Sequence, residues 1–83
     1  MIERGEIWTL DDEKKYVVAS IVEIEQKVYV YLVKKDDYNK YVIGEFDGEG
    51  INEIEDPELL ETLLVRFNED LKTNLPNILA EYL

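Results

Sequence analysis

The hydrophobic pattern is densest between residues 16 and 34, where it predicts two β-strands. Tyr16–Ile24 and Lys27–Val33 are rich in Val, Ile and Tyr, which lose side-chain freedom in a helix and fit a pleated sheet. Glu25 and Gln26 separate the two runs, so we expect an antiparallel hairpin that turns there. A two-residue type I′ turn favours Asn-Gly, and this turn has no glycine, so a longer loop over Ile24–Lys27 fits equally well.

The period of two along a strand assigns these side chains to faces. In the first strand one face receives Tyr16, Val18, Ser20, Val22 and Ile24. In the second strand one face receives Tyr29, Tyr31 and Val33, and the other receives Val28, Val30 and Leu32. Because both faces are largely apolar, we expect both to be covered. A C-terminal helix is the expected cover on one side, and a curled sheet or a partner chain on the other.

Shorter strands are predicted on either side of this hairpin. Glu6–Leu10 precedes it, and Tyr41–Phe46 and Ile51–Ile54 follow it. Lys34–Lys40 is the expected loop after the hairpin, because it is polar and contains turn-favouring Asp and Asn. Asp47–Gly50 is the strongest turn signal in the chain. The pattern therefore extends the hairpin into an antiparallel meander.

A helical period replaces the strand period after residue 55. Asp56–Glu58 supplies a capping Asp, a Pro for the first helical position and a Glu for the positive end of the helix dipole. The apolar side chains then recur at intervals of three and four residues: Leu59, Leu60, Leu63, Leu64, Phe67 and Leu71. Such a stripe packs on a sheet. Because Pro76 would break a continuing helix, we expect an end near residues 71–73 and a short terminal helix within Leu75–Leu83, either docked or protruding.

These elements predict an α+β fold in a single domain, with a β-meander over residues 1–55 and a helical segment over 56–83. The expected sheet is a curled antiparallel meander of four or five strands. One packed C-terminal helix and a short terminal helix complete it. A chain of 83 residues supports one modest core.

The composition excludes several chemistries. The chain has neither Cys nor His, which excludes disulfides and thiolate metal sites and disfavours zinc binding and triad-type hydrolysis. Asp36–Asn39 and Asp47–Gly50 lack the alternating ligand pattern of a calcium loop, so we expect no metal and no cofactor. No apolar run reaches the roughly 18 residues that cross a bilayer, and a signal-peptide pattern is missing. We therefore expect a cytoplasmic protein.

The charge is strongly negative and unevenly placed. Residues 1–42 carry 7 Lys/Arg and 9 Asp/Glu, a balance of −2, and residues 43–83 carry 2 and 11, a balance of −9, which gives −11 in total. Direct binding to nucleic acid or to an anionic membrane is therefore disfavoured. Eight acidic residues without an intervening Lys or Arg form the acidic run: Glu45, Asp47, Glu49, Glu53, Glu55, Asp56, Glu58 and Glu61. The run is either a surface for a basic partner or a solvated face.

Two candidate surfaces lead to three classes of function. Besides the acidic run, Tyr29 and Tyr31 share a strand face, so they form either an aromatic interface or part of the core. We expect a small, non-catalytic interaction or regulatory protein with a protein partner of basic character. A phage-encoded, nucleic-acid-mimicking inhibitor of a DNA-binding host protein is the alternative, and a carboxylate-dependent hydrolase or nuclease is the third. A homodimer would cover a second apolar face of the sheet.

The N-terminal half resembles small proteins of Gram-positive bacteria and their phages or mobile elements. Their pattern is a glycine, a strand ending in LDD, then KKYVV and YVYLV. Here these are Gly5, Leu10–Asp12, Lys14–Val18 and Tyr29–Val33. The chain is thus similar to the DUF1292-like family of domains of unknown function, a resemblance that implies a structural hairpin and no activity. It departs from them in its glycine-free turn at Glu25–Gln26 and its longer helical tail.

A weaker similarity lies at the N-terminus. Arg4–Trp8 reads RGEIW and is similar to the RGDIW opening of MazF/PemK-type ribonuclease toxins, which are SH3-like barrels. The proline-containing strand that follows in those toxins is missing here, and an acidic chain suits RNA binding poorly.

Overall fold

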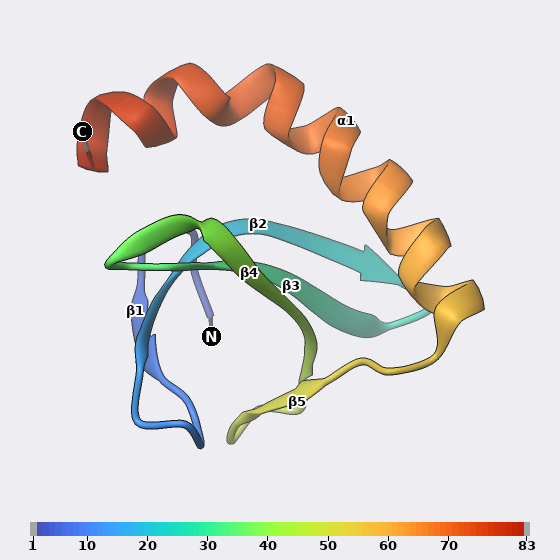
Figure 1. Ribbon diagram of the computed structural model, residues 1–83. Helices are drawn as coiled ribbons and strands as arrows, with labels where there is room; N and C mark the ends of the chain where they lie inside the picture. Colours follow the sequence, from blue (N-terminus) through green and yellow to red (C-terminus); the bar gives the residue numbers. More distant parts are fainter. Residues whose placement is uncertain (1, 83) are drawn as a thin grey trace.

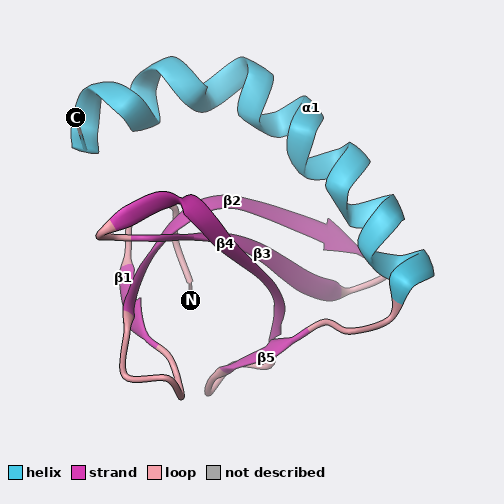
Figure 2. Ribbon diagram, in the orientation of Figure 1, coloured by secondary structure: helices cyan, strands magenta, loops and turns pink. Residues whose placement is uncertain are grey.

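The computed structural model describes residues 2–82, with side chains as far as Lys72. Its elements in chain order are β1 (Ile7–Thr9), β2 (Lys15–Ile24), β3 (Lys27–Lys34), β4 (Asp37–Phe46), β5 (Ile51–Glu53) and α1 (Pro57–Tyr82) (Figure 1). Each strand is antiparallel to its chain neighbour, in the order β1-β2-β3-β4-β5. The sheet curls into an arch, and α1 crosses its convex side (Figure 2). The predicted α+β meander is confirmed, with five strands.

The turn between β2 and β3 has two residues although it contains no glycine. Ile24 pairs directly with Lys27, and the two residues between them have positive φ, 51° at Glu25 and 69° at Gln26. Positive φ at both central positions is the geometry of a type I′ turn, which suits the right-handed twist of the strands. The shorter of the two loops that the sequence allowed is therefore the one that forms.

The second hairpin also turns more tightly than expected. Lys34 pairs with Asp37, so the turn consists of Lys35 and Asp36 rather than of the whole predicted loop Lys34–Lys40. The register between β3 and β4 then shifts beside Lys34, because Val33 pairs with Tyr41. Residues 38–40 have no partner in β3, but they belong to β4, which begins at Asp37. The prediction of a loop over these residues is therefore wrong.

A β-bulge in β2 changes the predicted faces. The register with β3 shifts between Val18 and Ser20, so Ala19 is an extra residue in the strand. Tyr16 and Val18 pack on the concave side, whereas Val22 packs against α1. The expectation that one face carries every even-numbered residue of β2 is therefore wrong. The side chains change faces at the bulge.

The two faces of the sheet have separate cores. On the concave side, where the N-terminus lies inside the arch (Figure 1), the buried residues are Ile2, Tyr16, Val18, Val30 and Leu32. On the side of α1 the buried residues are Val22, Tyr29, Ile43, Leu63 and Phe67. Both faces are thus covered, as the apolar pattern predicted, and the chain covers the concave face with its own N-terminal residues.

The helix begins where its capping signals predict. The Asp56 carboxylate accepts a hydrogen bond from the backbone N–H of Glu58 at 3.0 Å, and the Asp56 carbonyl accepts the first helical bond, from Leu60, at 2.9 Å. Its end was predicted wrongly, because α1 continues through Pro76 to Tyr82 and replaces the two expected helices. A proline inside a helix removes one hydrogen bond and bends the helix without always ending it.

Whether the terminal segment docks or protrudes depends on side chains after residue 72, which lie outside the described residues. Within the described residues, no helix has the length and apolar character that a membrane crossing requires.

Candidate functional site

An open groove lies between α1 and β3 of the sheet. Its volume is about 370 Å³ and it is lined by Tyr31, Leu64, Val65, Phe67, Asn68 and Leu71. We call these residues the helix–sheet groove. Phe67 and Tyr31 belong to the packing between helix and sheet, and the remaining lining residues all come from α1. The groove is therefore formed by the way in which the helix is seated on the sheet.

The helix presents only part of its predicted apolar stripe to the sheet. Leu63 and Phe67 are fully buried between α1 and the sheet. Of the strands, β2 lies closest to α1. Residues one position later on a helix point about 100° away. Leu64 consequently faces outward and is 40% exposed, and its neighbour Val65 is 56% exposed. These two apolar side chains form the outer wall of the groove.

The sheet contributes an aromatic side chain to the groove, Tyr31. The rings of Tyr31 and Tyr41 stack with centroids 5.2 Å apart and an interplanar angle of 9°, and Tyr31 also contacts the Phe67 ring at 5.6 Å. Burial, and then the nearby Tyr41 hydroxyl, raise the pKa of Tyr31. Tyr41 remains 51% exposed. The stack thus offers a flat, half-open surface beside the groove.

The two tyrosines of the predicted aromatic interface have different environments. Tyr29 is 5% exposed and belongs to the core beneath α1, which is the alternative that the sequence left open. Tyr31 lines the groove. Tyr41, which sequence reasoning did not select, takes the place of Tyr29 as the exposed member of the pair. Its spacing of ten residues from Tyr31 across a predicted hairpin could have suggested this contact.

The outer edge of β4 is open at Tyr41, whose ring stacks on Tyr31 of the groove lining. β5 pairs only with Gly44–Phe46 of β4, and the N–H of Ile54 donates to the carbonyl of Ile43 at 2.9 Å. Alternate residues of an antiparallel strand direct their backbone groups to the same side, so Tyr41 directs its N–H and C=O outward as Ile43 does. Among the described strands, none pairs with this edge at Tyr41.

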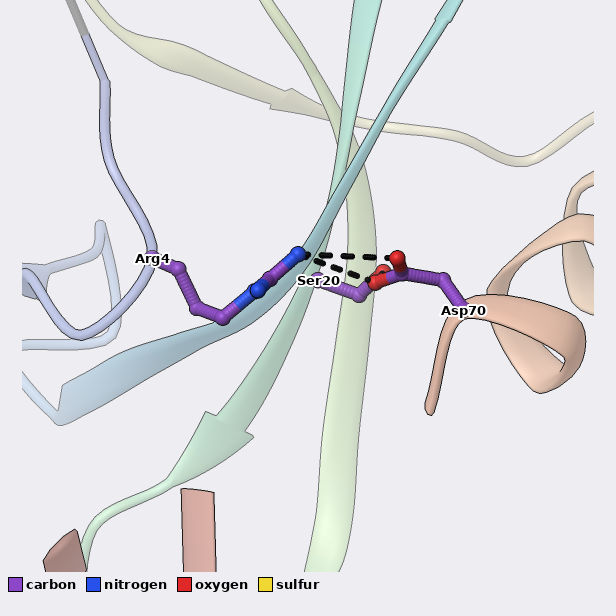
Figure 3. Close-up of polar contacts among 3 residues, drawn as sticks. All are labelled: Arg4, Ser20 and Asp70. Atoms are coloured by element: carbon purple, nitrogen blue, oxygen red, sulfur yellow. Dashed lines mark hydrogen bonds and ion pairs between the residues drawn. The ribbon is translucent and has the colours of Figure 1, made fainter. Parts of the chain in front are cut away.

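Three polar residues fix the helix over the sheet (Figure 3). Asp70 of α1 accepts a hydrogen bond from the Ser20 hydroxyl at 2.5 Å. The same carboxylate forms an ion pair with the Arg4 guanidinium at 3.3 Å. Ser20 is fully buried and directly follows the bulge at Ala19. We call these three residues the Asp70 cluster. Because the bulge turns Ser20 toward the helix, this cluster joins α1 to β2 and to the N-terminal segment.

The acidic run follows the end of the sheet and the start of the helix. Its members lie in β4, the turn after it, β5, the linker and the first turns of α1, and all are exposed except the half-buried Glu45. Two of them have structural partners. Asp56 caps α1, and Asp47 accepts bonds from the backbone of Glu49 and Gly50, which lowers its pKa. The run is thus an exposed band rather than a closed site.

A smaller cavity of about 230 Å³ opens at the concave side of the arch. It is lined by Leu10, Asp11, Asp12, Tyr16, Val42, Ile51 and Glu53. Asp12 accepts a hydrogen bond from the Tyr16 hydroxyl at 2.9 Å. That bond raises the pKa of Tyr16, and a backbone bond from Lys14 is the main cause that lowers the pKa of Asp12. Within the described residues no acidic cluster is arranged to hold a metal ion.

The exposed residues of the groove were not predicted. Leu64 was assigned to the buried stripe, and Val65 was not assigned to any surface. A helical pattern gives the width of an apolar stripe but not which part of it meets the sheet.

Comparisons with known proteins add no assignment to this geometry. The chain matches no protein-family model, no curated protein and no solved structure. The resemblances noted for the N-terminal half therefore stay predictions.

Proposed function

We propose that this chain is a non-catalytic interaction module that binds a segment of a protein partner in the helix–sheet groove. The observation that carries the proposal is the exposed apolar wall, Leu64 and Val65, which lines the groove together with Tyr31, whose ring stacks on the half-open Tyr41. Contiguous apolar and aromatic surface beside a rigid scaffold is typical of binding sites for proteins. A cytoplasmic location is part of the proposal and rests on the sequence alone.

The partner is basic in this proposal. The net charge of −11 repels acidic proteins and attracts basic ones over distances of about a Debye length, near 8 Å at physiological salt. Glu58 and Glu61 lie on α1 within two turns before Leu64 and Val65 and are exposed. Carboxylates beside an apolar groove would steer a basic segment toward it.

The first experiment selects ligands with the intact chain. A phage-displayed library of random decapeptides is panned against the immobilised protein, and the affinities of enriched peptides are measured by fluorescence polarisation. We expect enriched peptides whose affinity falls roughly tenfold or more for Leu64→Asp and Val65→Asp, because a charge in the groove wall must be desolvated on binding. The exposed position of both residues allows these variants to fold, which circular dichroism verifies.

A matched control distinguishes binding in the groove from nonspecific binding elsewhere on the surface. Ile7→Asp places the same charge at an apolar side chain that is 48% exposed and lies in β1, outside the groove lining. Peptide affinity should stay within about twofold of the unaltered chain in this variant. If no peptide is enriched, or if the groove and control variants weaken binding equally, the proposal is wrong.

The exposed acidic run favours a second candidate, a nucleic-acid-mimicking inhibitor of a DNA-binding protein. Such a mimic would bind through Glu49, Glu53, Glu58 and Glu61, all exposed. Reversing these charges to Lys would then abolish binding to a DNA-binding protein, and Val65→Asp would leave it unchanged. Dependence on Val65 supports the groove instead.

A further inference from the structure

We infer that the groove takes its ligand as an added β-strand: an extended basic peptide that pairs with the open edge of β4 at Tyr41 and inserts alternate side chains beneath α1. This inference rests on the proposed function and specifies the form of its ligand. It starts from the juxtaposition of an unpaired strand edge and an apolar groove lined by a helix.

The backbone geometry supplies the first step. β5 is only three residues long and leaves β4 at Ile43, where the last bond comes from Ile54. Beyond that point the backbone groups of Tyr41 point outward with no described strand beside them. An extended peptide placed there continues the line of β5 as the next neighbour of β4. Main-chain bonds of this kind provide affinity in strand addition, and pockets for alternate side chains provide specificity.

Side-chain pockets supply the second step. Tyr41 and Ile43 belong to the sheet face that α1 covers. Tyr41 stacks on Tyr31, and Ile43 packs in the core between α1 and the sheet. In an added strand every second side chain would point to this same face. Those side chains would reach Leu64 and Val65, whose exposed surfaces would become buried. The peptide is therefore expected to alternate apolar and polar residues.

The charge around the groove supplies the third step. Glu45 lies on β4 two residues beyond Ile43, so it shares the face of Ile43, and Glu61 lies about one turn before Leu64 on α1. The end of the groove nearest the start of α1 is therefore acidic. A peptide with Lys or Arg at that end complements these carboxylates, whereas a second copy of this acidic chain brings further negative charge.

The outer edges elsewhere are less suited to strand addition. β1 and β5 have three residues each, and the end of β2 that β1 leaves unpaired lies closest to α1. The cavity beside β5 has three carboxylates in its lining, Asp11, Asp12 and Glu53, and a helix beside an edge hinders an incoming strand. Of the described edges, that of β4 is the one at which an open residue, Tyr41, stacks on the lining of the helix–sheet groove.

The test uses the peptides enriched from the decapeptide library. Each is resynthesised with single N-methyl groups along its backbone, which remove one N–H donor and keep the side chain. Strand addition at Tyr41 predicts one sensitive position, the peptide residue whose N–H donates to the Tyr41 carbonyl: methylation there lowers affinity roughly tenfold or more, and methylation at its two neighbours has little effect. Amide exchange measured by nuclear magnetic resonance should slow at Tyr41 on binding. Glu61→Lys should weaken binding, more at low salt than at high salt.

The outcomes separate this inference from the proposed function. Peptides that need Leu64 and Val65 but tolerate methylation at all positions would overturn strand addition and leave the groove as a binding site. Failure to enrich any peptide would overturn both. Sedimentation of the full chain as a dimer that Val65→Asp dissociates would make a second copy the occupant, which also overturns the inference.

Discussion

The turn between β2 and β3 shows how a single pair of residues accepts an unfavourable backbone. Glu25 and Gln26 both have positive φ, a conformation in which the side chain of an L-residue approaches its own backbone. The structure tolerates this because the type I′ turn matches the strand twist and because the paired residues on either side fix it. The sequence predicted where the chain turns but not the turn type, since neither residue favours it.

Replacing this pair by Asn-Gly should stabilise the protein. The variant Glu25→Asn with Gln26→Gly relieves the strain at both positions, and we expect the free energy of unfolding to rise by about 0.5–1 kcal/mol in urea titrations. The matched control is Lys35→Asn with Asp36→Gly in the other two-residue turn, where no positive φ occurs. A similar gain in both turns would contradict the account, because the second turn has no such strain to relieve.

At the level of elements, the sequence predicts what lies close in the chain and misses what depends on packing. The hairpins and the start of α1 follow from periodicity and from the Asp56 cap. The bulge does not, because Val17, Val18 and Ala19 leave no polar position to mark an extra residue. The groove does not either, since it depends on α1 burying Leu63 and leaving Leu64 outside.

The Asp70 cluster connects these elements and can be tested by a double-mutant cycle. Asp70→Ala leaves the buried Ser20 hydroxyl without its partner on α1, and we expect a loss of about 1–3 kcal/mol in the free energy of unfolding. Adding Ser20→Ala should recover part of this loss, because no buried donor then remains. Urea denaturation of the two single variants and the double variant measures the coupling.

The ion pair in the same cluster should contribute less. The Arg4 side chain is 40% exposed, and solvent-exposed pairs are worth roughly 0–1 kcal/mol. Arg4→Met is therefore the control in which the charge is lost and the Ser20 bond stays. Equal losses for Arg4→Met and Asp70→Ala would contradict the view that the buried hydroxyl dominates.

At the scale of the whole molecule, a small arch carries a large charge. The net charge is −11 on 83 residues, and the exposed acidic run occupies one end of the sheet and the start of α1. Asp11, Asp12 and Glu53 line the opening of the arch together. Repulsion among carboxylates raises the free energy of the compact state relative to the unfolded chain. Charged residues at short edge strands generally hinder such strands from joining other sheets.

Screening this charge should stabilise the fold. Between about 10 mM and 200 mM NaCl the Debye length falls from about 30 Å to under 10 Å, so we expect the midpoint of thermal unfolding at pH 7 to rise with salt. In a variant with Glu49→Gln and Glu55→Gln, two exposed members of the acidic run, the midpoint should depend less on salt. A midpoint that falls or stays constant as salt is added would show that favourable ion pairs outweigh the repulsion.

The neighbour-to-neighbour order of the strands has a consequence for the order in which the chain folds. Each strand finds its partner in the segment that has just preceded it, so the sheet closes only short loops, which is the topology of fast folding. The contact between Arg4 and Asp70 spans 66 residues and joins the first turn to the last element. During synthesis the arch can therefore assemble before α1 has emerged. The groove forms last, when the helix docks, so a half-made chain displays the sheet without the groove.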